Sequence, residues 1–116
     1  MRHIEDQLQI ACVRYFDYAF PRISHLLHHS PNGGKRNLRE AARFKTMGVR
    51  PGFPDLILLV ANKEYNYLAI ELKTPKGVQS DKQKEYQRLM ESNRGKYKIC
   101  RNVDDFIKTV QEYLSN

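Results

Sequence analysis

Two apolar segments joined by a short polar connection constrain this chain more than any other feature of its sequence. Residues 55–60 begin with Asp55 and are otherwise apolar. Residues 67–73 form a second apolar run, which ends in Glu71-Leu72-Lys73. Runs of this length and composition are typical of strands that are covered on both faces. Because residues 61–66 are too few for a parallel crossover, we expect the two strands to pair as an antiparallel hairpin.

Helical periodicity and turn signals precede this hairpin. Apolar residues at spacings of three and four predict a helix over residues 2–20, which Pro21 ends. We expect a short strand at residues 23–28. A basic helix is then expected over residues 38–47, with Gly48 in position to close it.

After the hairpin, the sequence again predicts a helix, a strand and a helix. Ser80 and Gln83 fit a capping box, which predicts a helix that starts there and ends at Gly95. A strand is expected at residues 97–100, and Asn102 is placed to cap a last helix. The order helix, strand, helix, hairpin, helix, strand, helix predicts an α/β fold in which helices pack on a sheet in two or three layers.

Length and composition set the class of protein. The 116 residues fit one domain, residues 1–116, with one modest core. No apolar run approaches the roughly 20 residues of a membrane span, and the N-terminal residues lack the apolar region of a secretory signal. We therefore expect a cytoplasmic protein. Cys12 and Cys100 are far apart among apolar neighbours, which favours buried free thiols.

The positive charge is clustered. The chain carries 20 basic and 13 acidic residues, and residues 35–50 hold six basic residues against one acid, a net charge of +5. Such clustering is typical of a surface that binds a polyanion, although a solvated basic helix would look the same. A membrane-surface role is less supported, because the segment lacks an apolar face with aromatic anchors. The residues assigned to phosphate contacts are Lys35, Arg36, Arg39, Arg43 and Lys76.

Charged side chains meet at one end of the predicted hairpin. Glu71 and Lys73 share a strand face because side chains alternate, and Asp55 begins the partner strand, so it should lie close to Glu71. Two carboxylates with a lysine suit a hard divalent ion and the hydrolysis of a phosphodiester bond. The alternative is a plain salt bridge between Glu71 and Lys73 on a solvated strand face.

These residues also carry a family resemblance. The strings RPGFPD at residues 50–55, ELKTPKG at residues 71–77 and SDKQ at residues 80–83 resemble the VRR-NUC branch of the PD-(D/E)XK nuclease superfamily. The similarity runs from the first predicted helix to about Val110. It implies a restriction-endonuclease-like fold, a mixed sheet flanked by helices.

The resemblance also implies roles for site residues. Asp55 and Glu71 would hold Mg²⁺ or Mn²⁺, the backbone carbonyl of Leu72 would complete the protein ligands, and Lys73 would be the catalytic lysine. Glu5 matches an acid that the family often places in its first helix, and it would be a further ligand or catalytic group. Gln83 matches the family glutamine near the site, although periodicity alone makes it a capping residue.

The function that follows is a metal-dependent, structure-selective DNA endonuclease. VRR-NUC domains occur fused in DNA-repair nucleases and also alone in phage and bacterial proteins. The stand-alone members are similar to Holliday junction resolvases and act as homodimers. We therefore expect a homodimer that cuts four-way junctions in a bacterial or phage-infected cell. The alternatives are a nuclease for flaps, nicks or ordinary duplex, and a DNA-binding module without catalysis.

Other chemistries find little support in the sequence. No GxxxxGK loop is present, so no nucleotide cofactor is expected, and no Ser/His/Asp arrangement points to acyl transfer. His25, His28 and His29 form a cluster, but zinc would need further ligands at suitable spacing. Phosphate contact or plain surface exposure is the expectation for these histidines.

Overall fold

The predicted hairpin lies inside a four-stranded sheet. The computed structural model describes residues 4–31 and 37–116. In chain order the elements are α1 (Ile4–Ala19), the short 3-10 helix η1 (Ser24–Leu26), β1 (Leu27–His29), α2 (Leu38–Thr46), β2 (Leu56–Leu58), β3 (Tyr67–Leu72), α3 (Asp81–Ser92), β4 (Gly95–Cys100) and α4 (Val103–Leu114). Their order is the one that the sequence predicts.

The sheet is mixed, with spatial order β1-β2-β3-β4. β2 pairs antiparallel with β3, with Leu56 opposite Ile70, which confirms the hairpin. β1 adds antiparallel to β2 on the outer side. β4 runs parallel to β3, with Tyr97 opposite Ala69, so α3 forms the crossover between these two strands. The α/β fold class is confirmed.

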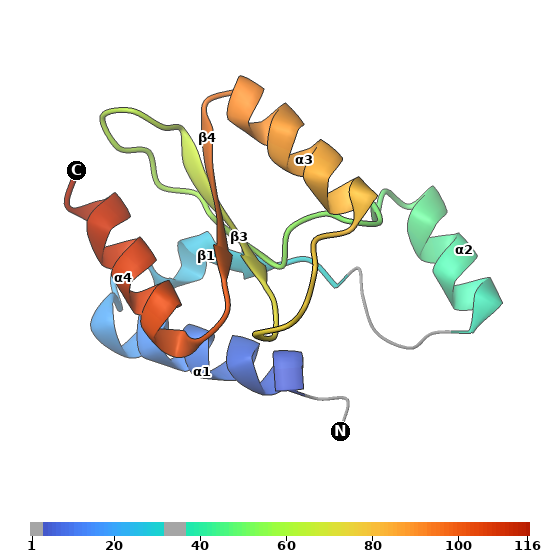
Figure 1. The fold of residues 1–116 in the computed structure, drawn as a ribbon, viewed down its shortest axis with the longest axis horizontal. Helices are drawn as coiled ribbons and strands as arrows, with labels where there is room; N and C mark the ends of the chain where they lie inside the picture. The colour runs from blue at the N-terminus through green and yellow to red at the C-terminus, as the bar shows by residue number, and fades with distance from the viewer. Residues whose placement is uncertain (1–3, 32–36) are drawn as a thin grey trace.

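Helices cover both faces of the sheet, which gives three layers (Figure 1). α1 and α4 lie together on one face and α3 lies on the other. The inner residues of α1 and α4 form the core together with alternate residues of β2 and β3. The largest fully buried side chains of this core are Phe16, Leu56, Leu58, Leu68, Ile70, Phe106 and Val110. Glu71, between Ile70 and Leu72, therefore points to the face of α3.

Two helix starts follow the expected capping chemistry. Ser80 and Gln83 form a capping box at α3, in which the Ser80 Oγ accepts from the Gln83 N–H and the Gln83 Oε1 accepts from the Ser80 N–H. Asn102 caps α4, because its Oδ1 accepts from the Asp105 N–H at 2.7 Å. Both predicted helix starts are confirmed.

The strands before and within the hairpin are shorter than predicted. The segment expected as a strand at residues 23–28 forms η1 first, and β1 starts at Leu27. β2 covers three residues instead of six, and Leu59, at the end of its apolar run, is 61% exposed. The apolar pattern identified the hairpin but overestimated the length of strand that is paired.

Gly95 does not end α3, and that prediction is wrong. Arg94 takes the left-handed conformation at φ 65°, and Gly95 is the first residue of β4. Gly95 is needed for packing, because a Cβ at this position would lie 2.5 Å from ring atoms of Tyr67 on the neighbouring strand. A glycine in this place lets the Tyr67 ring cross the strand.

Two expectations from composition can be compared with the fold. Cys12 and Cys100 are free thiols and both are fully buried in the core, as predicted. In the part of the chain that the structure describes, no helix combines the length and the hydropathy that a membrane crossing requires.

Candidate active site

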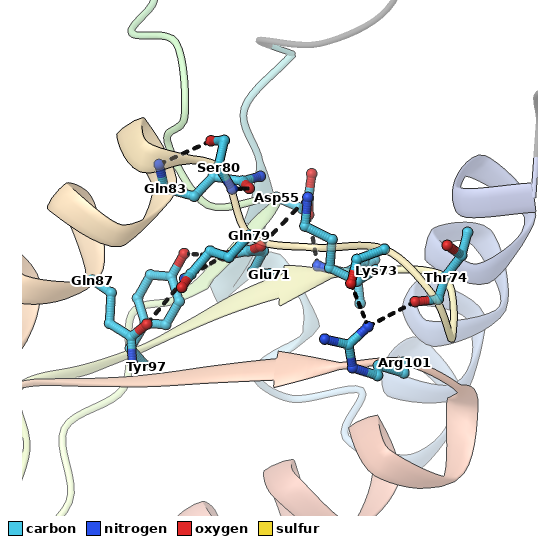
Figure 2. A network of polar contacts seen from close by, with 12 residues as sticks. Asp55, Glu71, Lys73, Thr74, Gln79, Ser80, Gln83, Gln87, Tyr97 and Arg101 are labelled. Atoms are coloured by element: carbon cyan, nitrogen blue, oxygen red, sulfur yellow. Dashed lines mark hydrogen bonds and ion pairs between the residues drawn. The ribbon is translucent and has the colours of Figure 1, made fainter.

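Glu71 is a fully buried carboxylate on the face of the sheet that α3 covers. Its Oε1 accepts two hydrogen bonds, one from the Tyr97 hydroxyl at 2.5 Å and one from the Gln79 Nε2 at 3.0 Å (Figure 2). Its Oε2 is buried and has no hydrogen-bond donor among the described residues. The two oxygens of one carboxylate thus have very different surroundings, which is costly for the ionised group unless a cation faces Oε2.

Lys73 brings a positive charge to that oxygen. Its Nζ lies 3.7 Å from the Glu71 Oε2, and its side chain is 13% exposed (Figure 2). The ion pair of the alternative interpretation therefore exists, but it is buried at the carboxylate and does not lie on a solvated strand face. At 3.7 Å the contact is an ion pair without a short hydrogen bond.

Asp55 precedes β2 and reaches the end of β3. Its Oδ2 accepts a hydrogen bond of 2.7 Å from the Leu72 N–H. Its backbone carbonyl accepts from the His29 Nδ1 at 2.8 Å, because a carbonyl cannot donate. Burial raises the pKa of Asp55, the Leu72 hydrogen bond lowers it, and the charges of Glu5 and Glu71 raise it further. The carboxylates therefore influence one another through space.

A cavity of about 210 Å³ opens beside Asp55. Asp55 and Leu72 form its sheet side, and His29, the last residue of β1, and Pro31 also line it. The first turns of α1 close the cavity with Glu5, Asp6 and Gln9. The structure thus places the predicted acid of the first helix, Glu5, in one cavity with Asp55.

The carboxylates at this end of the hairpin fit a hard divalent ion. The observation in favour is the buried Glu71 Oε2, which has no donor among the described residues, at the end of the hairpin where the Asp55 carboxylate contacts Leu72. Over residues 4–31 and 37–116, no group of three His, Cys, Asp or Glu side chains is close enough to hold a metal ion by itself. An ion would therefore be held by the carboxylates of Asp55 and Glu71, by the Leu72 carbonyl and by water.

The comparisons with known proteins agree with this geometry. The sequence model of the VRR-NUC domain matches residues 3–104, from the start of α1 into the first turn of α4. The chain belongs to the VRR-NUC domain family. A solved structure described as a VRR_NUC domain protein superimposes with a TM-score of 0.83 at 29% sequence identity, over 96% of this chain and 88% of that chain. No curated protein matches the chain.

Membership of the VRR-NUC family gives the chain a nuclease-type function and confirms the predicted resemblance. The mixed sheet with helices on both faces is consistent with the restriction-endonuclease-like fold. The matched residues include the whole hairpin, α3 and β4. Every side chain described above for the candidate site of this VRR-NUC domain therefore lies within the matched region.

Gln83, the glutamine expected near the VRR-NUC site, contributes its amide oxygen to the cap of α3. The glutamine that contacts Glu71 is Gln79, four residues earlier, in the loop before α3. A catalytic role for Gln83 stays a prediction, since the contacts described for it belong to the capping box.

The residues assigned to phosphate contacts are spread over the surface. Arg39 and Arg43 are exposed on α2, which projects from the body of the VRR-NUC domain (Figure 1). None of the nine residues of α2 is buried. Lys76 is exposed in the turn after β3. Lys35 and Arg36 lie outside the described residues. Phosphate binding by these five residues stays a prediction.

Two groups at the site were not anticipated from the sequence. Tyr97 was treated only as a strand residue, yet its hydroxyl reaches Glu71. Strand alternation in β4 together with parallel pairing to β3 would have placed it on the face of Glu71. Gln79 has no such signal, because its position depends on the path of the loop from Lys73 to Ser80.

Proposed function

We propose that this VRR-NUC domain is a divalent-metal-dependent DNA endonuclease that selects branched DNA. The observation that carries the proposal is the buried Glu71 Oε2, which has no hydrogen-bond donor in the described chain and faces Lys73. Asp55 supplies a second carboxylate at the same end of the hairpin. A pair of carboxylates suits Mg²⁺ or Mn²⁺, and an adjacent lysine suits the stabilisation of charge on a phosphate during hydrolysis.

Each residue has a defined task in this proposal. Asp55, Glu71 and the Leu72 carbonyl would hold the ion, which when bound would lower the pKa of a water and stabilise negative charge on the phosphoryl oxygen. Lys73 orients the attacking water or stabilises the charge that develops on the phosphate. Glu5, in the same cavity as Asp55, orients a further water or completes the ligands.

The exposed basic residues supply affinity for the DNA backbone. Arg39, Arg43 and Lys76 are exposed, and phosphate contacts of this kind position a duplex without reading its sequence. Binding should therefore weaken steeply as the salt concentration rises. Selectivity for branched DNA would come from shape, and we propose the four-way junction as the preferred substrate.

Two symmetric cuts in a junction require two sites, so we propose that the active form is a homodimer. An exposed apolar surface is available for the second copy. Leu38 and Met47, at the two ends of α2, are 89% and 67% exposed, and an apolar groove lined by Phe44, Val49 and Phe53 lies beside Met47. Light scattering during size-exclusion chromatography gives the mass directly, and a monomer at micromolar concentration would contradict the dimer.

Cleavage of defined substrates tests the reaction. Labelled four-way junction, flap and linear duplex are incubated with the protein in Mg²⁺, in Mn²⁺ and in chelator. Paired symmetric nicks in the junction, dependent on the metal, support the proposal. Equal cutting of all three substrates would remove the junction preference. Binding without any metal-dependent cutting would favour a non-catalytic DNA-binding module instead.

Substitutions assign the activity to this site. Asp55→Ala and Lys73→Ala should abolish cutting and leave DNA binding largely intact, because neither residue belongs to the proposed phosphate contacts. Lys108→Ala is the matched control, since Lys108 is exposed on α4. Cutting by Lys73→Ala at the normal rate would show that the assigned role of Lys73 is wrong.

A further inference from the structure

The two oxygens of the Glu71 carboxylate are held in an asymmetric arrangement. Oε1 accepts from both Tyr97 and Gln79, whereas Oε2 has no donor in the described chain and faces the Lys73 ammonium (Figure 2). A half-turn only exchanges two equivalent oxygens, but any other rotation of the carboxylate would break both hydrogen bonds and leave the buried Tyr97 hydroxyl without this acceptor. The orientation of this carboxylate is therefore fixed before any ligand arrives.

The direction of the Gln79 amide is set by a chain of contacts along α3. Its Nε2 donates to the Glu71 Oε1 and also, at 2.9 Å, to the Gln87 Oε1. Gln87 in turn donates through Nε2 to a carboxylate oxygen of Glu91 at 3.2 Å. Glu71 and Glu91 lie at the two ends of this series of hydrogen bonds, and a carboxylate can only accept. The two glutamines between them must therefore donate toward the carboxylates, so Gln79 presents its NH₂ group to Glu71.

Tyr97 is a permanent donor in this arrangement. Its side chain is 4% exposed, and its hydroxyl donates to the buried Glu71 Oε1 at 2.5 Å. A carboxylate oxygen can only accept, so the hydroxyl is the donor in this contact.

We propose that Tyr97 and Gln79 are positioning residues that hold Oε1 of Glu71 and leave Oε2 as the single oxygen through which Glu71 binds the divalent ion. This inference rests on the proposed function, since it assigns the metal-binding oxygen of the same site. Neither residue contacts DNA or the ion in this proposal. Both act through the orientation of Glu71, as outer groups around metal ligands do in other proteins.

Titration with Mn²⁺ alone tests the inference without DNA. Free Mn²⁺ is followed by electron paramagnetic resonance in the presence of the wild-type protein, Tyr97→Phe and Gln79→Leu. Each substitution removes one donor to Oε1, and we expect each to weaken Mn²⁺ binding by roughly 10- to 100-fold. The double variant should bind more weakly than either single variant.

Tyr113→Phe is the matched control. Tyr113 is 5% exposed and its hydroxyl donates to the Val60 carbonyl at 2.7 Å, so the substitution removes an equally buried hydroxyl hydrogen bond outside the described site. It should lower the melting temperature and leave the dissociation constant of Mn²⁺ unchanged. Equal weakening of Mn²⁺ binding in Tyr113→Phe and Tyr97→Phe would show that general destabilisation, and not positioning, causes the effect.

Cleavage kinetics give the second readout. At saturating Mn²⁺, Tyr97→Phe should lower kcat and leave the KM for DNA unchanged, because Tyr97 is too buried to contact the substrate. Wild-type Mn²⁺ affinity in both Tyr97→Phe and Gln79→Leu would overturn the inference while the proposed function stands. A wild-type protein that neither binds Mn²⁺ nor cuts DNA would overturn the proposed function itself, and the inference with it.

Discussion

Oδ2 of Asp55 accepts a hydrogen bond of 2.7 Å from the backbone N–H of Leu72, which lies 17 residues later in the chain. Leu56 and Ile70 are the last paired residues of β2 and β3 on this side. The bond from Asp55 to Leu72 therefore extends the contact between the two segments beyond the last backbone pair. The register of the hairpin therefore places the carboxylate of Asp55 beside the end of β3, where Glu71 and Lys73 are found. A change that shifts this register would separate the three charged groups without altering any of them.

Replacing Asp55 should abolish cleavage and raise the stability of the metal-free protein. Burial raises the pKa of Asp55, so the ionised side chain opposes folding when no metal is bound. Asp55→Asn keeps an oxygen that accepts from Leu72 and removes the charge. We expect a melting temperature a few degrees above wild type in chelator, together with loss of cleavage. Thermal melts by circular dichroism measure the first effect.

The sign of the pH dependence follows from the same shift. Because the folded-state pKa is raised above the ordinary value of 3.8, protonated Asp55 contributes stability that is present below this value and is lost as the pH rises through the raised one. The advantage of Asp55→Asn over wild type should therefore be small near about pH 3 and larger at about pH 7. An equal difference at both pH values would contradict this assignment.

The central hairpin and its charged residues could be predicted because they follow short-range rules. Alternation along a strand puts Glu71 and Lys73 on one face, and the short connection forces antiparallel pairing, which brings Asp55 to them. Capping by Ser80 and Asn102 is likewise encoded within four residues. These features need no knowledge of the tertiary structure.

The contact of Gln79 with Glu71 could not be predicted, because it depends on the loop between β3 and α3. Arg101, just after β4, donates from its Nη1 to the carbonyls of Thr74 and Gly77, both at 2.8 Å, and so ties this loop to the end of the sheet (Figure 2). That tie helps to set where Gln79 meets Glu71. No periodicity or capping signal relates Arg101 to Thr74, 27 residues earlier.

Removing the charge of Lys73 should destabilise the metal-free protein. Lys73→Met leaves the buried Glu71 Oε2 without the cation that lies 3.7 Å away. An unsatisfied buried group costs roughly 1–3 kcal/mol, so the free energy of unfolding should fall by about that amount in chelator. Urea unfolding followed by tyrosine fluorescence measures the change.

Added Mn²⁺ separates this effect from general damage. An ion bound at Oε2 replaces the missing positive charge, so Mn²⁺ should restore more stability to Lys73→Met than it adds to wild type. Lys108→Met, at an exposed position on α4, is the matched control and should unfold like wild type. Equal responses of Lys73→Met and wild type to Mn²⁺ would show that the ion does not reach Oε2.

Gly95 should tolerate no side chain. A Cβ here would lie 2.5 Å from ring atoms of Tyr67, so Gly95→Ala forces the ring or β4 to move. Overpacking of this kind costs about 1–3 kcal/mol, which urea unfolding would detect. Tyr67→Leu should relieve part of the clash, so the double variant should lose less stability than the sum of the two single variants.

Gly48→Ala distinguishes crowding from backbone strain. Gly48 has a φ of 110°, and no atom of the described residues lies within 4 Å of the position that a Cβ would take. This variant should lose only the roughly 1 kcal/mol of an unfavourable left-handed conformation, and no change at Tyr67 should rescue it. Rescue of Gly48→Ala by Tyr67→Leu would show that the effect at Gly95 is not a local clash.

The buried thiol of Cys12 should be unreactive in the folded protein. Burial raises the pKa of Cys12 from 9.0 to about 12, with a smaller contribution from Cys100 nearby. At about pH 8 only about one thiol in 10⁴ would be ionised, and the thiolate is the reactive form. Labelling with an aromatic disulfide reagent should be slow in the native protein and fast in urea.

The same shift makes folding sensitive to alkaline pH. Because the folded-state pKa is raised, the neutral thiol contributes stability that is present below the ordinary value of 9.0 and is lost as the pH rises toward about 12. Cys12→Ala removes this dependence, so its melting temperature should fall less than that of wild type between about pH 8 and about pH 11. Fast native labelling at about pH 8 would contradict the burial of this thiol, because it would require an opening of α1 from α4 that the packed core opposes.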